Sequence, residues 1–245
     1  MATNGMRSRL SSKLLHAPEA PAIVLLHGIQ GTAKTWDAIA PQVPPRYRVI
    51  APNLRGRADA YVPDESSEYQ LEKFASDLLS VINEAGPTPI VVAWSMGVSV
   101  VLALLEEQPD LSLSGLILVG GSACVGSEAR WFSGDSLPEV AREASERSKR
   151  LALIEAAAPH AVAASWMAVK RKDLRHVLST VQCPTLIIHG VDDDQCPIEH
   201  GRLMQRQIPS ATMQEWPDTG HNPMASNPIR FAQTVVEFAD SLRAY

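Results

Sequence analysis

The sequence predicts an α/β protein, in which a mostly parallel sheet is flanked by helices and a helical cap is inserted late in the chain. Three observations lead to this class. Apolar runs suited to buried strands alternate with helical patterns, one long stretch breaks that alternation, and the 245 residues fit a single α/β domain.

The predicted strands are short apolar runs, most of them followed by a glycine, proline or serine turn. A strand in a parallel sheet is buried on both faces, so it is apolar throughout instead of alternating. Five runs fit this description, and a sixth, short strand precedes the last helix. They are 22–26, 48–51, 90–93, 116–119, 185–189 and 212–216.

The predicted helices lie between these strands. The segment 98–105 is apolar, and 228–242 opens with a proline and repeats apolar residues at helical spacing. The segment 70–85 has one apolar face, formed by Leu71, Phe74, Leu78 and Ile82. Strand and helix therefore alternate, as in a parallel sheet that helices cover.

The segment 123–180 breaks this alternation, because no strand is evident and Ala, Glu, Arg and Lys predict several short helices. We interpret it as a cap on an α/β core formed by 1–122 and 181–245. The cap carries nine basic and seven acidic residues, whereas the whole chain has a net charge of -5. Its run Lys170, Arg171 and Lys172 is typical of a solvated helix face, with docking of an anionic substrate or an acidic carrier protein as the alternative.

Charge and cysteine content limit the partners and the compartment. With 22 basic and 27 acidic residues, we expect no nucleic-acid partner and no anionic membrane surface. No run reaches the ~18 apolar residues of a membrane span. The N-terminus lacks the apolar run of a signal peptide, and the three scattered cysteines do not suggest a disulfide framework. We therefore expect a cytoplasmic protein.

The segment Ala93-Trp94-Ser95-Met96-Gly97 is a candidate nucleophile elbow. It joins a predicted strand to an apolar helix, and such a turn exposes the serine hydroxyl in a strained backbone conformation. Small residues two positions before and after the serine let strand and helix approach closely. On its own the pentapeptide is equally typical of a serine that only caps a helix.

A serine hydroxyl becomes a nucleophile when a base takes its proton, and a carboxylate must hold that base in the correct tautomer. His221 lies in Gly220-His221-Asn222-Pro223, after the last predicted strand. Asp193 follows the strand 185–189, at the sheet edge where α/β enzymes gather their active sites. The chain order Ser95, Asp193, His221 predicts a catalytic triad.

Two further motifs complete a family pattern. His27-Gly28-Ile29-Gln30-Gly31 follows the first strand, with Trp36 in the next helix, and Asn53-Leu54-Arg55-Gly56 follows the second strand. Together with the three triad segments, they make nearly the whole chain resemble the α/β-hydrolase family. Within it, the chain is similar to the small cap-bearing esterases and haloperoxidase-like enzymes. Ala93 and Asn53 depart from the usual glycine and aspartate, and neither position supplies a reacting group.

The resemblance implies an oxyanion hole formed by the backbone N–H groups of Ile29 and Met96. Fixed donors of this kind stabilise the charge that develops in acyl transfer. Five large side chains are candidates for an apolar acyl pocket, with simple packing of the cap as the alternative. They are Trp94, Trp131, Phe132, Trp166 and Met167.

The resulting hypothesis is a serine hydrolase that cleaves a small-molecule carboxylic ester through an acyl-enzyme, with no metal and no cofactor. A thioesterase, lactonase, C–C hydrolase or cofactor-free perhydrolase could use the same residues. The chain also resembles pimeloyl-acyl-carrier-protein methyl ester esterases, which would make acyl carrier protein a partner. A catalytically silent protein that binds a small ligand is the alternative of another class. We expect a monomer or a small homo-oligomer.

Overall fold

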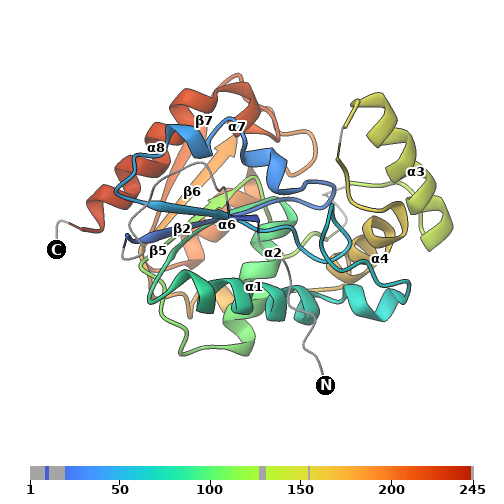
Figure 1. Cartoon of the computed structure of the whole chain (residues 1–245), viewed down its shortest axis with the longest axis horizontal. Coiled ribbons are helices and arrows are strands. Elements are labelled where there is room, and N and C mark those ends of the chain that lie inside the picture. The colour runs from blue at the N-terminus through green and yellow to red at the C-terminus, as the bar shows by residue number, and fades with distance from the viewer. Residues whose placement is uncertain (1–8, 11–19, 127–130, 154, 244–245) are drawn as a thin grey trace.

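The computed structural model describes residues 9–10, 20–126, 131–153 and 155–243. Its centre is a seven-stranded sheet in the order β1-β3-β2-β4-β5-β6-β7, with helices on both faces (Figure 1). All neighbouring strands are parallel except β1 and β3. The predicted α/β class with a mostly parallel sheet is therefore confirmed.

The strands lie close to the predicted runs. They are β2 (Ala22–Leu26), β3 (Arg48–Ala51), β4 (Ile90–Trp94), β5 (Gly115–Val119), β6 (Thr185–Gly190) and β7 (Ala211–Trp216). The antiparallel edge strand β1 (Arg9–Leu10) was not predicted, because two residues carry no apolar run that a sequence pattern could detect. The central strand β4 pairs with β2 and β5, so the residue after it lies in the middle of the sheet edge.

The two faces of the sheet bury separate apolar clusters. Alternate residues of β2 divide between them, since Ile23 and Leu25 join one cluster and Val24 and Leu26 the other. The helices α1 (Leu71–Ala85), α2 (Met96–Glu107) and α6 (Glu199–Gln207) cover one face. The other face is covered by α8 (Pro228–Ser241) and the 3-10 turns η1 (Ala33–Trp36) and η2 (Ala40–Gln42).

The segment 123–180 contributes α3 (Leu137–Arg150), α4 (Pro159–Val169) and α5 (Arg175–Leu178). Helix α3 packs on α4, which contacts α1 and the 3-10 turn η3 (Ser66–Tyr69), whereas α5 packs on α2 and α6. Figure 1 shows α3 at the far side of α4 from the sheet. The division into a core and a cap at residues 123 and 180 stays a prediction.

The basic run at the end of α4 is largely neutralised. Lys170 forms an ion pair with Asp135 at 2.7 Å, and Lys172 forms ion pairs with Glu72 at 2.7 Å and Glu106 at 3.3 Å. Two of the three cations that could have docked an anion therefore already have carboxylate partners.

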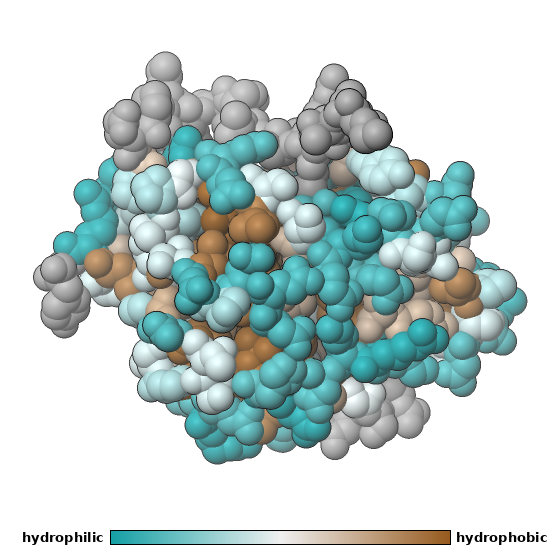
Figure 2. Space-filling view, turned by 90° about the horizontal axis from the view of Figure 1, so that it is seen from below, coloured by the Kyte–Doolittle hydropathy of each residue, from teal (hydrophilic) through white to brown (hydrophobic). Residues whose placement is uncertain are grey.

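The surface seen from below in Figure 2 is mostly hydrophilic, and its hydrophobic residues gather mainly in one hollowed area. This distribution agrees with the burial of the apolar strands and helix faces in the two clusters. Within the described ranges, no helix combines the length and the apolar character needed to cross a membrane.

Candidate active site

Ser95 occupies the sharp turn between β4 and α2. Its backbone has φ 56° and ψ -118°, a conformation that L-residues rarely adopt. A Cβ at Gly97 would lie 3.0 Å from the carbonyl oxygen of Leu26, so only glycine lets α2 start this close to β2. A Cβ at Gly28 would likewise lie 3.1 Å from the Cβ of Ser95. The strained turn and its small neighbours hold the hydroxyl at the sheet edge.

Ser95, His221 and Asp193 form a continuous hydrogen-bonded chain. Ser95 Oγ lies 2.9 Å from His221 Nε2, and His221 Nδ1 lies 2.9 and 3.0 Å from the two carboxylate oxygens of Asp193. Because the ionised carboxylate only accepts, Nδ1 donates to Asp193 and Nε2 is free to accept from the serine hydroxyl. All three side chains are buried.

Asp193 is held as a carboxylate by its surroundings. Burial by itself would raise its pKa, but hydrogen bonding from His189 and His221 outweighs burial, so the pKa lies well below its usual value. The backbone N–H groups of Gln195 and Cys196 also donate to Oδ1, at 2.9 and 2.8 Å. The carboxylate therefore stays charged and fixed at neutral pH.

The loop that carries His221 is tied to its neighbours. Trp94 Nε1 donates to the carbonyl oxygen of His221 at 2.9 Å, and the two rings lie 5.5 Å apart. The end of β6 also approaches this loop closely, because a Cβ at Gly190 would lie 2.2 Å from the carbonyl oxygen of Thr219. The loop that positions the imidazole is thus held by the ends of β4 and β6.

The hydrogen-bonded chain opens into a cavity of about 670 Å³. Ser95, His221, Ile29 and Trp94 form its sheet side, and residues of the segment 123–180, among them Trp131, form the opposite side. Of the five side chains predicted to bind substrate, Trp94 and Trp131 line this cavity.

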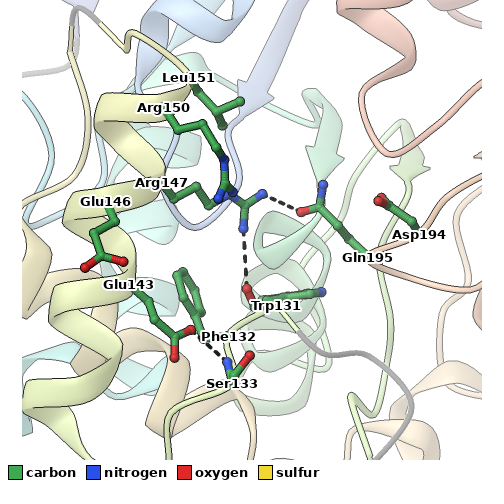
Figure 3. Close-up of a pocket in the computed structure, with 10 residues that line it drawn as sticks. All are labelled: Trp131, Phe132, Ser133, Glu143, Glu146, Arg147, Arg150, Leu151, Asp194 and Gln195. Carbon is green, nitrogen blue, oxygen red and sulfur yellow. Dashed lines mark hydrogen bonds between the residues drawn. The ribbon is translucent and has the colours of Figure 1, made fainter.

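The other three predicted pocket residues lie elsewhere. Phe132 lines a neighbouring pocket of about 570 Å³, which Figure 3 shows. Trp166 is buried behind Trp131, with ring centroids 5.3 Å apart. Met167 is partly buried against the apolar cluster and lines neither space. The aromatic cluster of the inserted segment thus supports the cavity wall more than it lines it.

The two residues predicted to form an oxyanion hole flank Ser95. Ile29 lines the cavity, and Met96 is the first residue of α2, where backbone N–H groups have no partner within the helix. The positive end of the helix macrodipole is therefore at the serine. The thioether side chain of Met96 is fully buried.

His27 supports the turn that carries Ile29. Its Nε2 accepts from the backbone N–H of Leu54 at 3.1 Å, so the proton on Nδ1 donates to the carbonyl oxygen of Gly28 at 2.8 Å. Burial, and secondly the charge of Arg57, lower the pKa of His27 from 6.5 to about 3. The imidazole is therefore neutral at pH 7 and supports the turn through these two hydrogen bonds.

Arg57 is a buried cation that the sequence analysis missed. Its guanidinium donates to the carbonyl oxygen of Ile29 at 2.7 Å and to Ser165 Oγ of α4 at 3.2 Å, and it lies 3.9 Å from the sulfur of Met96. Burial lowers its pKa to about 10, so it stays protonated at neutral pH. Only its place after the motif Asn53-Leu54-Arg55-Gly56 could have drawn attention to it.

Metal ligands are not gathered at this site. Among the residues that the structure describes, no three His, Cys, Asp or Glu side chains are placed to bind a metal ion together.

The model of the alpha/beta hydrolase family matches residues 23–234 of the sequence. The chain belongs to this family. A curated relative of this hydrolase is the pimeloyl-[acyl-carrier protein] methyl ester esterase of Aromatoleum aromaticum, 27% identical over 85% of this chain and 94% of the relative. The predicted family resemblance is therefore confirmed.

Solved structures agree with this assignment. A hydrolase from Pseudomonas aeruginosa superposes with a TM-score of 0.78 at 25% identity, over 97% of this chain and 99% of that chain. An esterase from Exiguobacterium antarcticum superposes with a TM-score of 0.77 at 22% identity, over 90% and 92% of the two chains. At this identity, the similarity to the Exiguobacterium antarcticum esterase shows that the two proteins share a fold.

Proposed function

We propose that this hydrolase is a serine esterase that cleaves a small-molecule carboxylic ester by way of an acyl-enzyme. The observation that carries the proposal is the hydrogen-bonded chain Ser95–His221–Asp193 at the wall of a cavity large enough for a small ester. Its similarity to an esterase that acts on an acyl ester supports the same reaction class.

In the proposed acylation, His221 Nε2 takes the proton from Ser95 Oγ as the oxygen attacks the acyl carbon. The tetrahedral intermediate collapses when the C–O bond to the alcohol breaks, and the imidazolium returns its proton to the leaving alkoxide. Asp193 stabilises the imidazolium through Nδ1–H without taking the proton itself. Water then repeats these steps, releasing the acid and restoring the serine.

The N–H groups of Ile29 and Met96 are the proposed oxyanion donors. Both residues adjoin the serine, one across the cavity and the other in the next position of the chain. Removing one fixed donor of this kind raises the activation barrier by about 2.7–4 kcal/mol. Arg57 contacts both residues from behind, so we assign it a positioning role at this hole.

The same residues could act on related acyl bonds. Hydrolysis of thioesters, lactones or carbon–carbon bonds, and cofactor-free perhydrolysis, are the alternative reactions. The proposed triad acts on the acyl group, and the fold does not select the leaving group. Because the Aromatoleum aromaticum relative is a pimeloyl-[acyl-carrier protein] methyl ester esterase, one form of the proposal is a carrier-bound acyl ester, with acyl carrier protein as partner. We place the protein in the cytoplasm as part of the proposal.

The test is a panel of p-nitrophenyl esters, acyl thioesters and lactones, assayed with the wild-type protein and Ser95→Ala. We expect the ester panel to give the highest kcat/KM and Ser95→Ala to lose turnover. A fluorophosphonate should label the wild type at Ser95 and leave the variant unlabelled. A protein that only binds a ligand would show neither turnover nor labelling, and equal turnover by both proteins would overturn the assignment of the nucleophile.

A further inference from the structure

Arg147 of α3 lies at the junction of the catalytic cavity and the neighbouring pocket. It lines both spaces, together with Trp131 and Gln195. Figure 3 shows its guanidinium directed away from α3 toward Gln195, whereas Glu146 lies on the other side of the helix. A positive charge is therefore presented to the space in front of Ser95.

Two neutral hydrogen-bond acceptors hold this guanidinium in place, and it also lies over the ring of Phe132, 5.9 Å from the centroid. It donates to Gln195 Oε1 at 2.5 Å and, over a longer 3.5 Å, to the carbonyl oxygen of Trp131. The backbone N–H of Gln195 in turn donates to Asp193, so the arginine is fixed relative to the proposed triad. These two bonds use only part of the five N–H donors of a guanidinium.

Among the described residues, no carboxylate forms an ion pair with Arg147, although the charge of Asp194 acts on it from a longer distance and favours its protonated form. Glu143, Glu146 and Asp194 also line the neighbouring pocket, but none forms an ion pair with it there. Glu143 accepts instead from the backbone N–H of Ser133 at 2.8 Å. By contrast, the Lys34 side chain of the catalytic cavity is paired with Glu155 at 3.0 Å. Arg147 is a half-buried cation facing space that a ligand could occupy.

A second cation reinforces this charge. Arg150, one turn further along α3, lines the neighbouring pocket, and its side chain has no hydrogen bond or ion pair within the described part of the chain. Burial, and secondly the charge of Arg150, lower the pKa of Arg147, and the charge of Asp194 opposes part of this shift. Two positive groups this close repel each other, and an anion between them would remove that repulsion.

We propose that Arg147, assisted by Arg150, binds an anionic group of the substrate at a distance from the scissile ester. This inference rests on the proposed esterase function and gives its substrate class: esters that carry a carboxylate or a phosphate elsewhere in the molecule. The planar fork of arginine donates two parallel hydrogen bonds to either group. An uncharged ester would leave the guanidinium with its neutral acceptors alone and no charged group to pair with.

The test compares charged and neutral esters of equal length. Monomethyl succinate, adipate and suberate are assayed against the corresponding dimethyl esters, with ω-phosphono methyl esters as a further arm that distinguishes phosphate from carboxylate. The proteins are the wild type, Arg147→Met, Arg147→Lys and the matched control Arg142→Met, whose side chain lies on the same helix and lines neither pocket.

We expect the wild type to prefer one charged ester over its dimethyl ester in kcat/KM. Arg147→Met should lower this preference about 10- to 100-fold, because the variant loses hydrogen bonds to a charged group, which are stronger than those between neutral groups. Arg147→Lys should retain part of it, and Arg142→Met should stay within about twofold of the wild type. A wild type without preference, or an unchanged preference in Arg147→Met, would refute the anion site.

A second measurement separates this inference from the proposed function. Calorimetry of the preferred monomethyl ester with Ser95→Ala reports binding without turnover. Binding that is lost in Ser95→Ala/Arg147→Met supports the anion site even if the chemistry differs from ester hydrolysis. Hydrolysis of dimethyl esters that depends on Ser95, together with binding unaffected by Arg147→Met, would leave the esterase proposal standing and refute this one.

Discussion

The two sides of the catalytic cavity are built in different ways. On the sheet side, Ser95, His221 and Asp193 are joined by hydrogen bonds of 2.9–3.0 Å. The chain segments around them pack so closely that a Cβ added at Gly190 would clash with the carbonyl oxygen of Thr219. The opposite side, from the segment 123–180, is formed by aromatic rings that pack at an angle to one another and by Arg147, whose hydrogen-bond partners are neutral. The sheet side thus holds the proposed reacting groups in one arrangement, whereas the other side presents apolar surface and a positive charge to the cavity.

The largest expected effect is at the carboxylate of the sheet side. Asp193→Asn should lower kcat by about 10⁴-fold, because an amide cannot hold the imidazole in the required tautomer. Steady-state kinetics with p-nitrophenyl butyrate measure the loss. Asp192→Asn, on the same loop and exposed, is the matched control and should stay within about twofold of the wild type. Comparable losses in both variants would contradict the assignment of Asp193.

A smaller loss should follow from moving the histidine loop. In Gly190→Ala, the new Cβ would lie 2.2 Å from the carbonyl oxygen of Thr219 and 2.4 Å from that of Gly220, so the loop must shift. A displacement of about 1 Å at a reacting group costs on the order of 100-fold in kcat. Gly220→Ala is the control, since its nearest contact is an ordinary 3.7 Å. Equal activity of the two variants would show that the close approach does not position His221.

The sheet side should also determine how stability depends on pH. The folded protein holds His27 at a pKa of about 3 against an ordinary value of 6.5, so the unfolded chain binds a proton that the folded one does not. The contribution of His27 to the free energy of unfolding is therefore complete above pH 6.5. It falls as the pH drops toward 3, by up to about 1.4 kcal/mol per pH unit.

Urea unfolding between pH 7 and pH 5 tests this slope. The lowered pKa of Asp193 acts only near and below its ordinary value of 3.8, outside this range. His27→Gln should reduce the slope, whereas Ser95→Ala, which keeps the buried imidazole, should not. A slope that persists unchanged in His27→Gln would assign it to other groups.

The smallest effect is expected on the side formed by the inserted segment. Trp131→Ala removes an aromatic surface of the cavity and should raise KM for longer acyl esters about tenfold, since loss of apolar contact in a pocket costs about 1–3 kcal/mol. The change should fall mainly on KM and be smaller for acetate than for hexanoate. An equal change for all chain lengths would place Trp131 outside the acyl pocket.

Much of the sheet side could be predicted from the sequence. Buried parallel strands are continuous apolar runs, and the elbow around Ser95 needs small residues at fixed spacing, so both leave local patterns. The order of Ser95, Asp193 and His221 then placed all three at one sheet edge, where the structure brings them together. The edge strand β1 left no such pattern because it has two residues.

The side formed by the inserted segment was predicted less well, for a physical reason. Phe132 lies in the loop before α3, where no periodic pattern exists, and the direction of Met167 on α4 depends on how α3 and α4 pack, which helical periodicity alone does not fix. The pattern of charged residues also failed to predict which cations lie near the cavity. Lys170 and Lys172 formed the obvious basic run yet have carboxylate partners, whereas the fully buried Arg57 and the cavity-facing Arg147 had no distinguishing pattern.

The hydrogen bond from Trp94 to the carbonyl oxygen of His221 matters most halfway through the proposed reaction. Once Ser95 carries the acyl group, its oxygen no longer has a proton to donate, and the histidine loses its link to the nucleophile. The indole, on the residue just before the serine, still ties the histidine loop to the elbow. The imidazole is then already in reach when water arrives to complete the turnover.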